Sequence, residues 1–211
     1  EMEHQLKDSK TKVVMTVDVL FEKVAEVADK VGFETVIVSE IADFLPGVKR
    51  VLGKALKKIP TGEVKPLPGK KVIRFLDAIK DIPADPVLVK RDMDDIIFLM
   101  YTGGTTGPSK GAMLTQRSYM CNRLQTITWL DLKPEDVALS AFPLFHIAGL
   151  ALGGFSLTHG ATIICVPNPR DTHFLIECAK KYKPTVIVNV PTIYYELMKI
   201  PEFKNLDFSG V

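Results

Sequence analysis

Residues 101–111 read YTGGTTGPSKG, and they lie between two predicted strands. The apolar run at residues 96–100 predicts a buried strand, and residues 112–115 predict a second, short strand. Glycines let the backbone turn sharply and approach a ligand closely, and the N–H groups of such a loop can surround an anion. The threonine and serine hydroxyls add hydrogen-bond donors, and Lys110 adds a positive charge. We therefore predict that this segment, the phosphate loop, binds a polyphosphate.

The phosphate loop is not of the Walker A type. That motif requires glycine directly before the lysine and serine or threonine directly after it, whereas here Ser109 precedes Lys110 and Gly111 follows it. The alternative is a glycine-rich hairpin that binds nothing. That alternative fits a lone Gly-x-Gly better than it fits Thr-Gly-Gly-Thr-Thr-Gly-x-x-Lys-Gly.

The loop resembles the phosphate-binding signature of the adenylate-forming enzymes: acyl-CoA synthetases, luciferases and the adenylation domains of peptide synthetases. Together with KGAMLT at residues 110–115, it looks most like the long-chain fatty acid–CoA ligases. Three positions depart from the family pattern: Gly103 replaces a hydroxyl residue, Ser109 a proline and Gln116 a histidine. The resemblance implies that ATP is held by Thr102, Gly103, Gly104, Thr105, Thr106, Gly107 and Lys110.

The resemblance also implies a two-step reaction. A carboxylate attacks the α-phosphate of ATP to give an acyl-adenylate and pyrophosphate, and the thiol of CoA then takes the acyl group and releases AMP. An anion must approach a polyanion in the first step, so loop donors and a lysine would stabilise the departing pyrophosphate. Lys110, Thr105 and Thr106 are the implied catalytic residues, and ATP, Mg²⁺ and CoA are the implied cofactors. The sequence assigns no metal ligand, and the family's acidic ligand is expected beyond Val211.

A second candidate site follows the strand predicted over residues 137–141. Ligands of parallel α/β sheets bind beyond the carboxyl ends of the strands, where His146 could orient a carboxylate or acyl group. The alternative is a histidine that caps the following helix. PLFH at 143–146 and VNVPT at 188–192 resemble the family segments beside the acyl site, although ordinary packing explains the second segment equally well. The implied substrate-binding residues are Phe145, His146, Val190, Pro191 and Tyr194.

The hydrophobic periodicity predicts an α/β fold with mostly parallel sheets and helices on both faces. Near the N-terminus, a strand (13–17), a helix (20–31) and a strand (34–39) predict a parallel βαβ unit. A short helix is predicted over residues 72–79. Further helices and strands alternate over residues 116–130, 137–141, 147–158, 161–166, 172–182 and 185–190.

The resemblance implies that the chain is an internal fragment of the N-terminal domain of an adenylate-forming enzyme. Residues 1–93 would form its βαβ part with a connector, and residues 94–211 would carry the phosphate loop and the acyl site. Family members are much longer at both ends, and the small C-terminal domain would be absent from this chain. We expect the fragment by itself to be inactive.

Residues 48–59 form a basic amphipathic segment. Such a helix can lie on an anionic membrane surface, which would suit a ligase whose substrate partitions into lipid. The alternative is a helix packed on the protein with a solvated basic face. Peripheral membrane contact is accordingly one expectation for these residues.

The composition indicates an ordinary globular protein, with 46% hydrophobic and 25% charged residues in 211. The net charge of +2 does not point to a nucleic-acid partner. The longest apolar stretch, residues 142–155, is shorter than the ~20 residues of a membrane span. The three cysteines form no CxxC pair, so we expect them to be reduced and mostly buried, in a cytoplasmic protein.

Two other functions fit the same residues. The chain could act only as a nucleotide-binding module, without catalysis. Alternatively, the enzyme could adenylate another carboxylate, or pass the acyl group to an acceptor other than CoA, such as a carrier-protein thiol. Segments expected beyond Val211, not the phosphate loop, would distinguish these functions.

Overall fold

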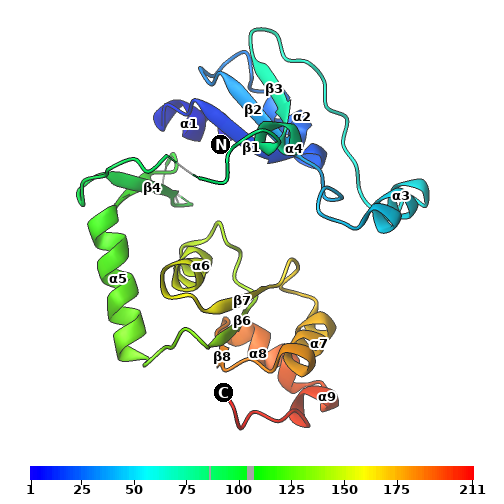
Figure 1. The fold of residues 1–211 in the computed structure, drawn as a ribbon, viewed down its shortest axis with the longest axis vertical. Coiled ribbons are helices and arrows are strands. Elements are labelled where there is room, and N and C mark those ends of the chain that lie inside the picture. The colour runs from blue at the N-terminus through cyan, green and yellow to red at the C-terminus, as the bar shows by residue number, and fades with distance from the viewer. Residues whose placement is uncertain (86, 104–106) are drawn as a thin grey trace. The chain divides into compact units, whose positions relative to one another are not determined.

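The chain forms two units in the computed structural model, which describes residues 1–85, 87–103 and 107–211 (Figure 1). Unit 1 comprises Glu1–Arg91 and Tyr101–Ala112, and unit 2 comprises Asp92–Met100 and Met113–Val211. The predicted division after residue 93 stays a prediction.

Unit 1 is built on a parallel sheet of three strands, β1 (Val13–Val17), β2 (Thr35–Ser39) and β3 (Lys71–Arg74), with β2 in the middle. The sheet confirms the two strands and the parallel pairing predicted near the N-terminus. Val36 and Val38 of β2 are completely buried, in a core that also contains Phe21 and Phe33.

The helix predicted over residues 20–31 is shorter than its periodicity suggests. A 3-10 turn, η1 (Asp18–Leu20), leads into α2 (Phe21–Ala25). After Ala25 the chain continues in tighter turns, in which Ala28 N donates to Ala25 O at 3.2 Å. Ala28 and Val31 are nevertheless buried in the same core. The spacing identified the buried face correctly but not the end of the helix.

The helix predicted over residues 72–79 was wrong in its first half. Residues 71–74 form β3, because the β-branched Val72 and Ile73 pair with β2. Helix α4 (Phe75–Ile79) begins only after that strand. The other helices of unit 1 are α1 (Met2–Asp8) and α3 (Gly47–Ala55).

Strands β4 (Ile96–Tyr101) and β5 (Gly111–Thr115) pair as a two-stranded sheet and confirm that strands flank the phosphate loop. The predicted burial of the first strand was wrong: no residue of β4 is buried, and Ile96 is 49% exposed. Each strand has residues in both units. Thr102 N donates to Lys110 O at 3.0 Å, so the two arms of the loop are joined just beyond the strands.

Unit 2 contains a second parallel sheet, in the order β7-β6-β8. Its strands are β6 (Val137–Ser140), β7 (Thr162–Cys165) and β8 (Val186–Ile187), the last much shorter than predicted. The described helices of unit 2 are α5 (Gln116–Trp129), α6 (Ile147–His159), α7 (Thr172–Tyr182), α8 (Pro191–Met198) and α9 (Pro201–Lys204). The helices predicted over 116–130, 147–158 and 172–182 are thereby confirmed.

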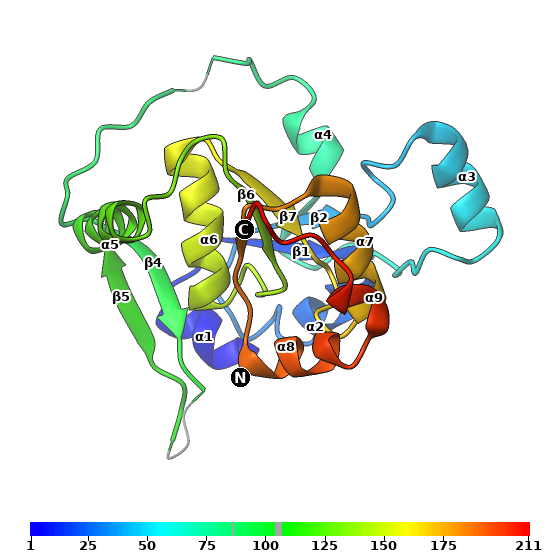
Figure 2. The same cartoon turned by 90° about the horizontal axis from the view of Figure 1, so that it is seen from below.

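Helices cover both faces of this sheet (Figures 1 and 2). On one face Leu139 and Ile164 pack with Leu175 and Ile176 of α7 and with Leu197 of α8. Helix α6 lies on the opposite face. The predicted α/β class, with mostly parallel sheets and helices on both faces, is confirmed.

The cysteines differ from the prediction. All three are free, but only Cys178 is buried, and Cys121 and Cys165 are exposed. The apolar neighbours of Cys165 in the sequence belong to a strand whose side chains alternate between two faces, so they do not imply burial of the cysteine. Within the described ranges, no helix is long and apolar enough to cross a bilayer.

Asp136 holds the start of β6 against the start of β8. Its carboxylate accepts hydrogen bonds from Thr185 Oγ1 at 2.6 Å and from Lys133 N at 2.7 Å. The Thr185 hydroxyl in turn accepts from Val137 N at 3.1 Å. The hydrogen bond from Thr185, followed by that from Lys133, lowers the pKa of Asp136 below its usual range.

We predict that Asp136→Asn lowers the melting temperature at pH 7. A carboxylate with a lowered pKa stabilises the fold above its unfolded pKa of about 3.9, and this contribution is lost as the pH falls through the folded value. The difference between variant and wild type should therefore shrink below about pH 4 in thermal melts. Asp131→Asn, which removes only an exposed pair with Lys133, is the control. An equal loss at pH 7 and pH 3 would contradict the charge-based explanation.

Helix α6 approaches the turn before it so closely that residue 149 must be glycine. A Cβ at Gly149 would lie 2.0 Å from the backbone oxygen of Pro143. A Cβ at Gly153, one turn further along, would meet only the side chain of Leu144 at 3.5 Å, an ordinary contact. Glycine is therefore required at one of these helical positions and not at the other.

We predict opposite effects of alanine at the two positions. Gly149→Ala should destabilise by about 1–3 kcal/mol, because the turn must move to admit the methyl group. Gly153→Ala should stabilise by roughly 0.5–1 kcal/mol, because alanine loses less conformational entropy in a helix. Thermal melts of the two variants test this pair. A Gly149→Ala variant as stable as Gly153→Ala would show that the close approach is wrong.

Candidate functional site

The phosphate loop connects β4 to β5. Gly104, Thr105 and Thr106 lie outside the described residues, so the structure describes only the two arms of the loop. Thr102 donates two hydrogen bonds to Lys110 O, from its backbone N at 3.0 Å and from its Oγ1 at 3.4 Å. The two arms are thus joined through the backbone of Lys110, whose side chain is exposed.

Helix α1 is attached to both arms of the loop. Tyr101 Oη donates to Asp8 Oδ2 at 2.6 Å, and this hydrogen bond raises the pKa of Tyr101. On the other arm, His4 Nε2 is hydrogen-bonded to Ser109 O at 2.8 Å. The rings of His4 and Tyr101 also meet edge to face, with centroids 6.5 Å apart. Sequence analysis found no role for His4, because its partner lies 105 residues away.

A cavity of about 410 Å³ lies beside the arms. Polar atoms of the loop line it together with His4: its walls include Gly103, Gly107 and Ser109. The Ser109 hydroxyl is buried and has no hydrogen-bond partner among the described residues. A buried hydroxyl costs free energy unless another group satisfies it.

His146 begins helix α6. Its Nδ1 accepts a hydrogen bond from Ala148 N at 3.2 Å, which is the helix-capping role considered as an alternative from the sequence. An accepting Nδ1 requires the neutral tautomer with the proton on Nε2. None of the described residues accepts a hydrogen bond from Nε2, and the ring is exposed. The cap therefore leaves one N–H free for a ligand.

The carboxyl end of β6 is tied to the segment after β8. Ala141 N donates to Asn189 Oδ1 at 2.7 Å, which joins the segments that precede His146 and Val190. Val190 immediately precedes helix α8, and Pro191 occupies the first position of that helix. Tyr194 Oη donates to Ile187 O at 2.9 Å. Burial raises the pKa of Tyr194, and its hydroxyl is engaged by the backbone instead of a ligand.

An apolar cavity of about 320 Å³ lies between α5, α6 and β8. Ala148, which donates to the His146 ring, lines it. None of the predicted substrate-binding residues lines this cavity. Its walls depend on which faces of α5 and α6 are turned toward the sheet, and the sequence motifs did not indicate those faces. The apolar wall is formed mainly by Ile127, Leu130, Leu152, Phe155, Val186 and Val188.

Arg123 is the charged side chain among the described residues that line the apolar cavity. It is only 4% exposed, and burial lowers its pKa. Its two terminal nitrogens donate to Ala151 O and Asn122 Oδ1, its guanidinium lies 5.1 Å from the centre of the Tyr119 ring, and its Nε has no partner. Arg123 was not among the predicted site residues, because an arginine in a helix usually extends into solvent.

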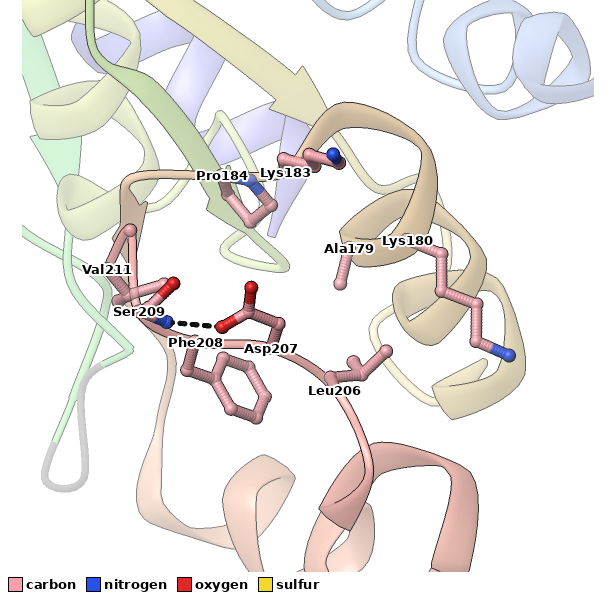
Figure 3. Close-up of a pocket in the computed structure, with 10 residues that line it drawn as sticks. Ala179, Lys180, Lys183, Pro184, Leu206, Asp207, Phe208, Ser209 and Val211 are labelled. Carbon is pink, nitrogen blue, oxygen red and sulfur yellow. Dashed lines mark hydrogen bonds between the residues drawn. The ribbon is translucent and has the colours of Figure 1, made fainter.

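Another cavity, of about 240 Å³, lies between the end of α7 and residues 206–211 (Figure 3). Lys183 and Asp207 line it, and Asp207 Oδ1 accepts from Ser209 N at 2.9 Å. None of the predicted site residues lines this cavity. The described residues contain no group of three or more His, Cys, Asp or Glu side chains that could hold a metal ion.

The chain matches the family model of the AMP-binding enzymes over residues 1–211, and it belongs to that family. It is 31% identical over 218 residues to the long-chain-fatty-acid–CoA ligase of Bacillus subtilis and 32% identical over 219 residues to that of Escherichia coli O157:H7. Each alignment covers 100% of this chain and 38% of the relative. A feruloyl-CoA synthase of Amycolatopsis is 33% identical over 158 residues, covering 74% of this chain and 29% of the relative.

Solved structures share the fold. The anthranilate CoA ligase AuaEII, in complex with anthranoyl-AMP, aligns with a TM-score of 0.76 at 22% identity, over 100% of this chain and 36% of that one. The long-chain-fatty-acid–CoA ligase FadD1 of Archaeoglobus fulgidus aligns with a TM-score of 0.62 at 24% identity, over 100% of this chain and 36% of that one. The resemblance inferred from the phosphate loop is confirmed for the family and for the fold.

We predict that His146→Ala destabilises the protein by about 1 kcal/mol, the usual effect of removing a side-chain cap. His146→Asn should restore the melting temperature, because asparagine accepts the same N–H and is among the best capping residues. Thermal melts of both variants provide the comparison. Equal stability of the alanine and asparagine variants would mean that the cap contributes nothing.

Proposed function

We propose that the full-length protein is an ATP-dependent ligase that activates a fatty acid as an acyl-adenylate and transfers the acyl group to CoA. AMP and pyrophosphate would be the other products. One observation carries the proposal: the phosphate-loop sequence, with its lysine, stands between two paired strands whose ends are joined by Thr102 and Lys110. Membership of the AMP-binding family supports the adenylation step, and the names of the bacterial relatives support a fatty acid and CoA.

We propose that the phosphate loop binds ATP through Thr102, Gly103, Gly104, Thr105, Thr106, Gly107 and Lys110. The charge of Lys110 and the hydroxyls of Thr105 and Thr106 would offset the repulsion between a carboxylate and the triphosphate as they approach. Mg²⁺ would supply further positive charge. The described residues offer no carboxylate cluster to hold that ion, so the role assigned to this chain rests on the loop itself.

We propose that the apolar cavity receives the acyl chain. Its apolar lining supports this, since burying a hydrocarbon chain there removes apolar surface from water. The free Nε2–H of His146, beside Ala148 of the cavity wall, would donate to an oxygen of the acyl carboxylate or adenylate. Phe145, Val190, Pro191 and Tyr194 would contribute to the walls around the strand ends.

Two alternatives concern the substrate and the acceptor. The feruloyl-CoA synthase and the anthranilate CoA ligase are named for aryl acids, so an aryl carboxylate is a second candidate for this chain. Transfer to an acceptor other than CoA is another alternative. A third is that the chain by itself serves only as a nucleotide-binding module. We propose the cytoplasm as its location, with peripheral contact to the membrane from which a fatty acid would partition.

The test is ATP–pyrophosphate exchange by the full-length gene product with short, medium and long fatty acids and an aryl acid. Exchange should depend on a long acid. Lys110→Ala should lower it at least tenfold, which corresponds to about 1.4 kcal/mol of lost transition-state stabilisation. Lys65→Ala is the matched control, because Lys65 is an exposed lysine that pairs only with Glu63 at 3.0 Å.

Each outcome has a distinct meaning. Exchange with the aryl acid alone would replace the fatty acid in the proposal. Exchange without formation of an acyl-CoA when CoA is added would replace the acceptor. A folded protein that shows no exchange with any acid would leave the nucleotide-binding module as the better account.

A further inference from the structure

Helix α3 carries an apolar face that no described residue of unit 1 covers. Val48, Val51, Leu52 and Leu56 have 73%, 67%, 54% and 62% of their surface exposed. Their spacing of three or four residues places them on one side of the helix and its C-terminal extension. The alternative considered from the sequence, in which this face packs on the protein, does not hold within unit 1. Soluble proteins rarely expose a continuous apolar patch unless it contacts a partner.

The helix is held apart from the sheet of its own unit. In both ribbon views α3 lies at the end of two connecting segments, away from β1, β2 and β3 (Figures 1 and 2). Its C-terminal end is closed locally: Lys58 N donates to Gly53 O at 2.9 Å, and Lys57 adopts the left-handed conformation with φ of 51°. The Ile59 side chain folds back onto Gly53, where an added Cβ would lie 2.3 Å from Ile59 Cδ1. The C-terminal end of α3 is therefore closed by contacts within the segment itself, and these contacts leave the apolar face exposed.

The charge around this face has one sign. Residues 44–62 contain five lysines or arginines and no aspartate or glutamate. Arg50 pairs with Asp43 at 3.8 Å, whereas no described acidic side chain pairs with Lys49, Lys57 or Lys58. Exposed cations that flank an exposed apolar face match the two layers of an anionic membrane surface, its phosphate headgroups and its acyl chains.

We propose that α3 docks the protein on an anionic lipid bilayer, lying in the plane of the interface. Val48, Val51, Leu52 and Leu56 enter the boundary between headgroups and acyl chains. Lys49, Lys57 and Lys58 contact the phosphates of anionic lipids. Nine helical residues are too few to span a bilayer, so the contact is peripheral. This docking needs neither ATP nor a fatty acid, and it stands independently of the proposed ligase activity.

The test is sedimentation of the full-length protein with phosphatidylcholine vesicles that contain or lack phosphatidylglycerol. Wild type should bind the mixed vesicles, bind the neutral ones at least tenfold more weakly, and lose binding as salt is raised. Val51→Ser with Leu52→Ser should lower the vesicle-bound fraction at least tenfold, and so should Lys57→Glu with Lys58→Glu. The controls are Leu157→Ser, an exposed leucine of α6, and Lys204→Glu, an exposed lysine of α9, both of which should bind as wild type does.

A second measurement reports insertion directly. Trp129 is the single tryptophan, so Trp129→Phe with Leu52→Trp places one fluorophore on the apolar face. Its emission should shift to the blue on mixed vesicles and be quenched by brominated lipid chains. The melting temperature and the detergent-solution ATP–pyrophosphate exchange of the α3 variants should equal those of wild type, since their side chains are exposed.

Three results would overturn the proposal. The first is that wild type does not bind anionic vesicles, and the second is that both α3 double variants bind them as well as wild type does. The third is that an α3 substitution changes the oligomeric state in sedimentation velocity but leaves vesicle binding unchanged. The last result would assign the apolar face to a second copy of the chain. Loss of exchange with intact vesicle binding would count against the ligase and leave the docking helix standing.

Discussion

Parallel strand pairing is the constraint on which the second candidate site depends. β6 pairs with β7 on one side and β8 on the other, so the chain leaves neighbouring strands at the same edge of the sheet. That edge brings together two segments more than forty residues apart, and the hydrogen bond from Ala141 to Asn189 joins them. His146 follows the end of β6 and caps α6 by accepting a hydrogen bond from Ala148 N.

The phosphate loop depends on a different kind of constraint. Glycine places few steric limits on the backbone, so contacts with other elements matter for the two described arms. Thr102 and Lys110 join the arms, and α1 holds each arm separately, through Asp8 on Tyr101 and through His4 on Ser109. Both described arms of the loop are therefore fastened by hydrogen bonds to other elements of unit 1.

Secondary structure was predictable where interactions between residues close in the sequence determine it. The strands at residues 13–17 and 96–100 follow from short runs of β-branched and apolar side chains. The prediction failed where pairing with a distant strand competed with a local preference, as at Val72 and Ile73. The predicted burial of Cys165 failed for a related reason, because alternation within a strand places neighbouring residues on opposite faces.

The sequence by itself determined the family and the class of fold, because both follow from contiguous residues whose types have direct physical meaning. Only the tertiary structure decided which distant groups meet. His4 reaches Ser109 across 105 residues, Arg123 is buried beside an apolar cavity, and the apolar face of α3 is left without a cover. Each of these depends on how helices turn their faces toward a sheet or away from it, and periodicity shows that a face exists without showing what it meets.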